Sequence, residues 1–547
     1  MASEEPVSAS ASALMSTSKR QQIDSLSILL QISMLGLAFV FGHILRRHKF
    51  YYLHEGSASL LIGLVVGALA RFTYPQDRFS NWFNFHEGFF FLFLLPPIIF
   101  DSGFNLQPGP FFSNFGAICT FAILGTLISA MVTGGFVYLG GRLSLVYKLP
   151  LLESCIFGSI ISATDPVSVL AVFQELGTDV NLYALVLGES VLNDAVAVSL
   201  YRSLVSVRQN LSASYNVTIA IIRFFITFLG SLFSGVSVAL LCALLFKFAG
   251  LHVHKLQHLE CCLIVLFPYF AYMFAEGLGL SGIVAILLCG ILMKHYTFPN
   301  LSESAQSFTA GFFHLIVSLA ETFVFMYMGV DIANERHSNW LHISFILFSV
   351  VILVVARAIN VYPLAYCINK LRSASRKIPI QHQNALWFSG LRGAMAFALA
   401  LQSVHNFQDS HGQVIFTTTT TIVILTVLVI GGSTSTMLEN LNLNKEKDEY
   451  SKVSIVEDEQ ESMLNTSNEE FAANSTRNHD LKSKFHILRK STSFKEIDMK
   501  ILKPFFTTSK SDSMLGLHTE DFLQYHTEGR NNAKLGHAKS DTAMVLN

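Results

Sequence analysis

The feature that most constrains this chain is a series of long apolar runs that recurs almost to residue 437. A run of about 20 apolar residues is long enough to cross the hydrocarbon core of a bilayer as an α-helix. We place about 13 such spans. They lie near residues 23–45, 56–72, 84–103, 112–139, 151–174, 182–204, 218–248, 259–277, 279–295, 308–331, 341–368, 384–403 and 413–435. The sequence therefore predicts an all-α integral membrane protein.

Composition supports a lipid-embedded chain. Hydrophobic residues make up 51% of the chain and charged residues only 14%, whereas soluble domains carry roughly 25% charged residues. A net charge of −1 provides no basic field for a nucleic acid partner. The seven cysteines fall inside apolar runs, without the spacing of a disulfide framework or a zinc site. We therefore expect a bilayer as the main partner, with no cofactor and no resident metal.

Three regions follow from this pattern. Residues 1–22 form a polar N-terminal segment that is rich in Ser and Ala and lacks the features of a cleavable signal. Residues 23–437 form the transmembrane domain. Residues 438–547 are rich in Ser, Lys, Glu, Asp and Asn, which predicts a soluble, largely disordered regulatory tail. Within this tail, Phe494 to Phe506 mixes aromatic and basic residues and is a candidate docking segment.

The distribution of Lys and Arg gives an orientation. Basic residues follow span 1 and cluster between spans 11 and 12, and such loops favour the cytosolic side. With 13 spans these loops share a side with the C-terminal tail, so we predict a cytosolic C-terminus. The loop after span 6 holds the glycosylation sequons of Asn210 and Asn216, and it would be lumenal.

Ionisable residues inside spans indicate a functional or structural role, because inserting each one into the bilayer costs roughly 2.5–3.5 kcal/mol of free energy on insertion scales. An unpaired arginine at position 357 of span 11 is physically implausible, and Glu189 of span 6 is its best available partner. The ionisable residues that we place deepest are Asp165, Glu189, Asp194, Glu321, Arg357 and Arg392.

Span 5 carries the sequence Thr164-Asp165-Pro166. Proline lacks a backbone N–H and breaks the helix there. We expect Asp165 to cap a new half-helix with Pro166 at its first position. Broken helices at membrane depth line cavities or are buried in protein, and their exposed termini suit ion coordination. The alternative reading is an ordinary proline kink with a capped end.

Span 6 carries Glu189-Ser190 followed by Asn193-Asp194. At about 100° per residue, Glu189 and Asn193 share a face and Asp194 points about 140° away from Glu189, so the two acids should have different roles. A lone carboxylate in a narrow apolar site can hold a proton or a cation, and this competition is the minimal machinery of exchange. The alternative is a buried polar cluster that only fixes helix packing.

Span 12 carries Gly390-Leu-Arg392-Gly393, which indicates a second helix interruption. Spans 5 and 12 hold corresponding positions if the two halves of the domain are repeats. Paired interrupted spans indicate inverted repeats whose broken helices cross at a midplane site. Asp165 would neutralise the N-terminal helix dipoles at the crossing, and Arg392 would neutralise the C-terminal ones.

At these residues the chain resembles the eukaryotic Na⁺(K⁺)/H⁺ exchanger family of the cation/proton antiporter superfamily. The likeness covers nearly all of residues 25–437. Its central motifs are Phe89–Phe100, which resembles the segment associated with amiloride-type inhibitors, Ala163–Pro166, Gly188–Ala195 and Gly390–Ala396. Four further segments resemble the endosomal branch, especially its plant members. These are Phe83–Glu87, Thr178–Tyr183, Glu260–Cys262 and Leu502–Thr507.

The resemblance implies which residues bind the transported ions. It implies electroneutral exchange of Na⁺ or K⁺ for H⁺, carried by the Asn193-Asp194 pair. Asp194 would be the ion carrier, and Asp165, Thr164 and Ser190 would lie near it. The resemblance also implies a transporter rather than an enzyme, which regulates lumenal pH and cation content by alternating access.

The same resemblance implies an architecture and a location. Spans 1–3 and 8–10 would form the dimer part of a homodimer, and spans 4–6 and 11–13 would form a mobile core. Glu189 and Arg357 would be a buried structural pair in that core. The protein would reside in the membrane of the endosome, the Golgi apparatus or the trans-Golgi network, and its tail would bind regulatory proteins.

The two alternative classes of function are an intramembrane protease and a cation channel. Gly279-Leu-Ser281-Gly282 matches a pattern found in intramembrane proteases, but no partner histidine in the expected context follows in a later span. A cation channel would carry a symmetric filter loop, which the sequence lacks. We therefore expect a secondary antiporter.

Overall fold

The computed structural model describes residues 5–47, 55–73, 87–106, 108–209, 217–249, 257–334, 343–372, 376–407, 410–441, 498 and 502–507. Almost all of them are helical, and none of them forms a strand. The sequons of Asn210 and Asn216 and most of the tail, including much of the stretch from Phe494 to Phe506, lie outside the described residues.

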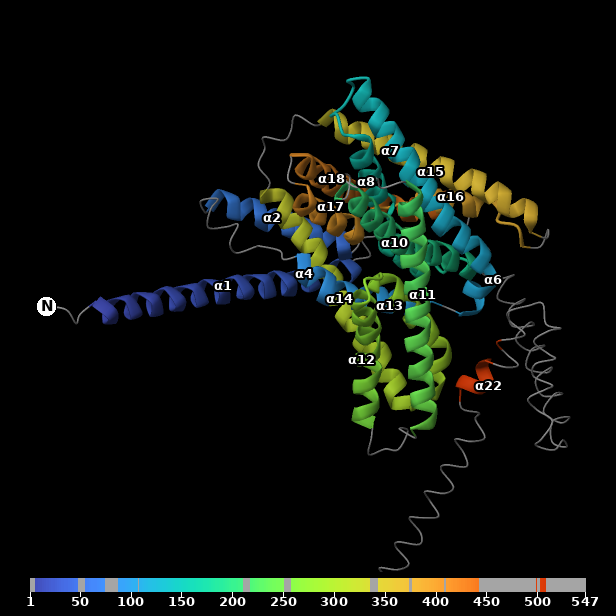
Figure 1. The fold of residues 1–547 in the computed structure, drawn as a ribbon, viewed down its shortest axis with the longest axis horizontal. Helices are drawn as coiled ribbons and strands as arrows, with labels where there is room; N and C mark the ends of the chain where they lie inside the picture. Colours follow the sequence, from blue (N-terminus) through green and yellow to red (C-terminus); the bar gives the residue numbers. More distant parts are fainter. Residues whose placement is uncertain are drawn as a thin grey trace, which may run out of the picture.

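Figure 1 shows the helices in their order along the chain. The first part of the chain forms α1 (Glu5–Arg47), α2 (Glu55–Thr73), α4 (Glu87–Phe89), η1 (Phe90–Leu94), α5 (Leu95–Phe104), α6 (Pro108–Cys119), η2 (Thr120–Gly125), α7 (Thr126–Arg142), α8 (Leu151–Ser162), α9 (Val167–Leu176) and α10 (Val180–Gln209). The second part forms α11 (Val217–Phe248), α12 (Gln257–Gly277), α13 (Gly282–Leu292), η4 (Met293–Thr297), η5 (Phe298–Asn300), α14 (Glu303–Asn334), α15 (Ile343–Leu371), α16 (Ile380–Phe388), α17 (Ala394–Asn406), α18 (Ser410–Asn440) and α22 (Lys503–Phe506).

The described helices fit a multi-pass membrane protein. Within the described ranges, 9 helices are long and apolar enough to cross a bilayer, and shorter apolar helices are also present. The predicted number of 13 spans stays a prediction. Helix α1 begins at Glu5, so it runs through the segment predicted as polar, and its apolar part begins at Ile28. Helix α18 ends at Asn440, three residues beyond the predicted end of the membrane domain.

Glycines allow some helix backbones to touch. Where α2 packs on α14, a Cβ atom at Gly63 would lie 1.9 Å from the carbonyl oxygen of Met326. A Cβ atom at Gly329 would lie 2.2 Å from the carbonyl oxygen of Leu60. Small residues that permit such approach are typical of helix packing in membranes, where van der Waals contact replaces the hydrophobic effect.

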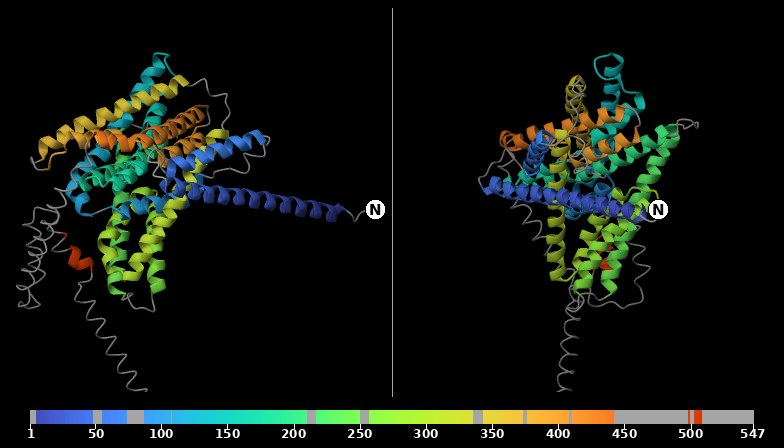
Figure 2. Two further views of the ribbon diagram at one scale, coloured as in Figure 1. Left: turned by 180° about the vertical axis from the view of Figure 1, so that it is seen from behind. Right: turned by 90° about the vertical axis from the view of Figure 1, so that its left-hand side faces the viewer.

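The packing between helices divides them into two sets. Figures 1 and 2 show the ribbon from three sides. One set contains α2, α5 and α11–α14, and the other contains α6–α10 and α15–α18. The most extensive packing lies within the sets, as between α2 and α14 or between α7 and α8. Helix α1 packs on α2 and extends away from both sets (Figure 1).

Both predicted interruptions are present, and they cross. Helix α8 ends at Ser162 before α9, and α16 ends at Phe388 before α17. The backbone N–H of Asp165, in the first break, donates to the carbonyl oxygen of Leu391, in the second, at 3.0 Å. This bond joins two segments that are more than 200 residues apart and holds the breaks against each other.

One detail of the first break differs from the prediction. Pro166 is the N-cap of α9 rather than its first helical residue, and the helix begins at Val167. The carbonyl oxygen of Pro166 accepts the first helical hydrogen bond from the N–H of Leu170 at 2.7 Å, as an N-cap carbonyl does. The cap is shifted by one residue because Pro166 has ψ near 16°, outside the helical range.

Candidate functional site

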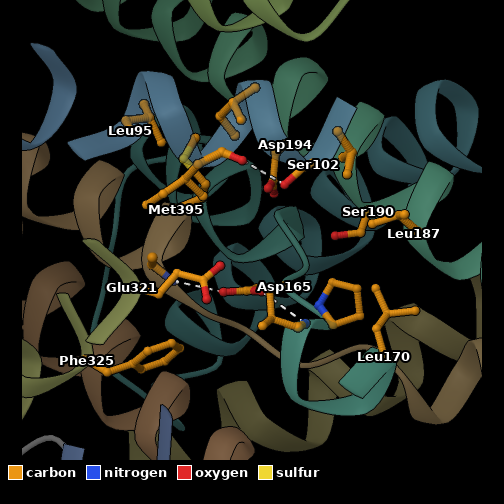
Figure 3. Close-up of a pocket in the computed structure, with 16 residues that line it drawn as sticks. Leu95, Ser102, Asp165, Leu170, Leu187, Ser190, Asp194, Glu321, Phe325 and Met395 are labelled. Carbon is orange, nitrogen blue, oxygen red and sulfur yellow. Dashed lines mark hydrogen bonds between the residues drawn. The ribbon is translucent and has the colours of Figure 1, made fainter. Parts of the chain in front are cut away.

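A cavity of about 60 Å³ lies where α5, α10 and α14 meet the two breaks. Three carboxylates line it, from Asp165, Asp194 and Glu321, together with the hydroxyl groups of Ser102 and Ser190. Figure 3 shows these side chains around one space. The rest of the lining is mostly apolar. It comprises Leu95, Ile98, Ile99, Pro166, Val167, Leu170, Leu187, Val191, Phe325, Ala394 and Met395.

Asp194 carries a carboxylate oxygen that no described residue contacts through a hydrogen bond. The residue lies on α10 and is 8% exposed. Its Oδ1 atom is buried and has no hydrogen-bond partner among the described residues. Buried polar atoms in native proteins are nearly always satisfied by protein, water or an ion. An unsatisfied carboxylate oxygen beside a cavity is therefore suited to hold a proton or a cation.

Asn193 and Thr164, which the sequence predicted as site residues, bind each other rather than line the cavity. The Asn193 side-chain amide donates to Thr164 Oγ1 at 2.6 Å, and its oxygen accepts from the Thr164 N–H at 3.1 Å. Ser190 Oγ donates to the Thr164 carbonyl oxygen at 2.5 Å. These bonds tie α10 to the first break and position Asp194, the next residue after Asn193.

Asp165 lines the cavity, and it also holds the crossing together. Its Oδ1 accepts from the N–H of Val167 at 3.2 Å, and its Oδ2 accepts from the N–H of Ala394 at 3.4 Å. One carboxylate thus faces the N-termini of both α9 and α17, where a negative charge is favoured. A Cβ atom at Gly393 would lie 1.9 Å from Asp165 Oδ2, so the second break has no space for a side chain there.

Arg392 lies at the C-terminus of α8, whereas Asp165 faces the N-termini of α9 and α17. Its guanidinium group is buried and donates to the carbonyl oxygen of Ala163, directly after α8, at 3.2 Å. A positive charge at a helix C-terminus complements the negative end of the dipole. The crossing therefore carries a negative charge at two N-termini and a positive charge at one C-terminus. Arg392 does not line the cavity.

Glu189 and Arg357 are in contact away from the cavity. Arg357 donates to both carboxylate oxygens of Glu189, and the Nη2–Oε2 distance is 3.0 Å. Arg357 Nη2 also donates to the carbonyl oxygen of Leu386 at 2.9 Å. The two side chains are 3% and 5% exposed. The contact joins α10 to α15 and α16, all within one of the two helix sets.

Glu321 is an ionisable residue that the sequence places within a span, without a predicted role at the site. It lies on α14, in the helix set opposite to Asp165 and Asp194, yet it lines the same cavity. Figure 3 shows its carboxylate directed toward Asp165. A charge within an apolar run was the available signal, and only packing between the sets brings it to this cavity.

Two crossing broken helices beside a buried carboxylate are typical of the class of secondary transporters. The fold matches a solved structure, the sodium proton antiporter MjNhaP1 from Methanocaldococcus jannaschii. The TM-score is 0.57 at 20% identity, and the match covers 76% of this chain and 98% of the antiporter.

The sequence comparisons identify the family. The family described as "Sodium/hydrogen exchanger, transmembrane" matches residues 35–440. Sodium/hydrogen exchanger 5 of Arabidopsis thaliana is 58% identical over 90% of this chain and 96% of the relative. Sodium/hydrogen exchanger 8 of Homo sapiens is 36% identical over 89% and 84%, respectively. The chain belongs to the sodium/hydrogen exchanger family, whose members are transporters rather than enzymes.

These matches confirm the predicted family and the likeness to plant members. They do not support the alternatives of an intramembrane protease or a cation channel.

Proposed function

We propose that the protein is an electroneutral antiporter that exchanges Na⁺ or K⁺ for H⁺. The observation that carries this proposal is the unpartnered Oδ1 atom of Asp194 beside the cavity. Asp165 has both oxygens engaged by helix N-termini, and Glu189 is engaged by Arg357. Among the carboxylates assigned from the sequence, Asp194 is the one with a buried oxygen left for cargo.

Competition at Asp194 would couple the two ions. The carboxylate is neutralised either by a proton or by a monovalent cation, so binding of one requires release of the other. The loaded site carries the same charge in both cases, and one cation would therefore exchange for one proton. Ser190 offers a further oxygen at the cavity. The hydrogen bond between Asn193 and Thr164, which lie outside the cavity lining, fixes the position of Asp194.

Alternating access would come from movement of the two helix sets. The set of α6–α10 and α15–α18 corresponds to the expected core, and α2, α5 and α12–α14 correspond to the expected dimer part of a homodimer. Asp165 and Asp194 belong to the first set, whereas Leu95, Glu321 and Phe325 face them from the second. Sliding one set along the other would open the cavity to one side of the membrane at a time.

Location and orientation complete the proposal. Basic loops on the tail side support a cytosolic C-terminus. The membrane would be that of the endosome, the Golgi apparatus or the trans-Golgi network, where exchange would set lumenal pH and cation content.

The proposal can be tested by measuring cation-dependent proton flux in liposomes that contain the purified protein. An imposed pH gradient should collapse when Na⁺ or K⁺ is added and persist with a large organic cation. Asp194→Asn, which keeps shape and removes the titratable group, should abolish this flux in a folded protein. Asp101→Asn is the matched control, because Asp101 lies on α5 outside the cavity lining. Cation-dependent flux of Asp194→Asn at the wild-type rate would refute the carrier assignment.

A further inference from the structure

A short segment of the C-terminal tail lies against the membrane domain. It comprises Asp498 and residues 502–507, with α22 within it. Figures 1 and 2 show α22 beside the end of α11. The contacts are with α11, η4 and η5, at the ends of α11 and α13 that share a side in the proposed cytosolic orientation.

Two side chains of the membrane domain bind the backbone of α22. Lys247 Nζ donates to the carbonyl oxygens of Pro504 and Phe505 at 2.9 and 3.0 Å. Asn300 Nδ2 donates to the carbonyl oxygen of Phe506 at 2.8 Å. The last carbonyls of a helix lack partners within the helix, and a positive charge beside them is favourable. The membrane domain thus supplies a cap for the tail helix.

One aromatic side chain anchors the segment. Phe506 is 7% exposed and packs against Ala243 of α11 and Tyr296 of η4. The Phe506 and Tyr296 rings lie 5.5 Å apart. Phe505, its neighbour, is 58% exposed. A single buried aromatic ring with a few hydrogen bonds is a small contact, well below the size of permanent interfaces, and is suited to reversible docking.

The carboxylate of Asp498 is the second anchor. It accepts from Tyr296 Oη at 2.6 Å and lies 2.7 Å from His295 Nε2. Both partners lie in η4, a π-helical turn at the end of α13, and such turns often mark functional sites. The His295 ring also lies 5.8 Å from the ring of Phe112. Phe112 belongs to α6, in the opposite helix set, so Asp498 binds a residue at the boundary between the sets.

We propose that Asp498 and residues 502–507 form a docking strap that binds α11, η4 and η5 and slows exchange while bound. The strap attaches to one helix set and fixes His295, whose ring contacts that of Phe112 on α6 of the other set. A restrained α6 resists the sliding that transport requires. This inference rests on the proposed function for its effect on rate, whereas docking itself is independent of it.

Docking can be measured without transport. The full-length Phe506→Ala protein, whose own strap is weakened, should bind a synthetic peptide of residues 494–510 in detergent. Peptides with Asp498→Asn or Phe506→Ala should bind about tenfold more weakly or worse, as expected for loss of a charged hydrogen bond or a buried ring. Lys503→Gln is the matched control, because this side chain is exposed. Absence of binding, or equal binding by all peptides, would overturn the strap.

Rate is the second readout. Full-length Asp498→Asn and Asn300→Ala proteins should exchange ions faster than wild type in liposomes, and the peptide should slow the full-length Phe506→Ala protein. Rates equal to or below wild type for both variants, with unchanged melting curves, would overturn the inhibitory role. If wild-type protein shows no exchange at all, the proposed function fails, while peptide binding still decides whether the strap docks.

Discussion

The buried pair of Glu189 and Arg357 gives the sharpest test of how the core is held together. Arg357 engages both oxygens of Glu189 and the carbonyl oxygen of Leu386, and both side chains are almost fully buried. Removing one partner leaves an uncompensated buried charge, which typically costs about 3–5 kcal/mol. We therefore expect Glu189→Gln and Arg357→Met each to be strongly destabilising.

The size of the effect on melting follows from the size of the domain. The unfolding entropy is roughly 2.1 cal/mol/K per residue. Over the roughly 400 residues of the membrane domain, a loss of 3–5 kcal/mol lowers the melting temperature by about 4–6 °C. Arg357→Met should cost at least as much as Glu189→Gln, because it also removes the hydrogen bond from Arg357 to the Leu386 carbonyl oxygen. That oxygen still accepts from Ser389 Oγ at 2.9 Å.

The double variant should recover much of this loss. With both charges removed, the remaining cost is one lost hydrogen bond to the Leu386 carbonyl oxygen, about 1 kcal/mol, because Ser389 Oγ still donates to that oxygen. Some exchange should return as well, because Asp194 is untouched. The assay is a double-mutant cycle on detergent-solubilised protein, read by melting temperature and then by liposome flux.

A second ion pair provides the control. Arg202 and Glu276 are also 3.0 Å apart, but their side chains are 33% and 29% exposed. Solvent screening limits such a pair to about 1 kcal/mol or less, so Arg202→Gln should barely change the melting temperature. Additive losses at Glu189 and Arg357, with the double variant worse than either single one, would refute the reasoning.

Three further predictions follow from the site and the tail. Asp194→Asn should give folded protein without cation-dependent proton flux, measured in liposomes beside a melting curve. Gly393→Ala should reduce folded yield and flux, because its Cβ would lie 1.9 Å from Asp165 Oδ2. Gly135→Ala, whose Cβ would meet nothing within 4 Å, should change neither, and equal behaviour of the two variants would contradict the tight crossing. Truncation after residue 441 should retain exchange in liposomes, at a rate equal to or above that of the full chain, since the described residues of the tail do not line the cavity. Loss of exchange in a well-folded truncated protein would make the tail part of the transport unit.

The helices and their interruptions could be predicted from the sequence, because both depend on local chemistry. A long apolar run favours a helix in lipid whatever surrounds it. Pro166 interrupts its helix because it lacks a backbone N–H, and Gly390 and Gly393 weaken theirs. The cost of a buried charge also made Glu189 the expected partner of Arg357, and these two side chains are in contact.

Only the tertiary structure decided which residues face the cavity. Asn193 and Thr164 bind each other behind it, while Glu321 reaches it from the opposite helix set. Helical periodicity gives the direction of a side chain around its own axis, but it carries no information on what lies in that direction. That depends on segments far apart in the chain, such as Asp165 and Leu391 at the crossing, whose packing no local pattern encodes.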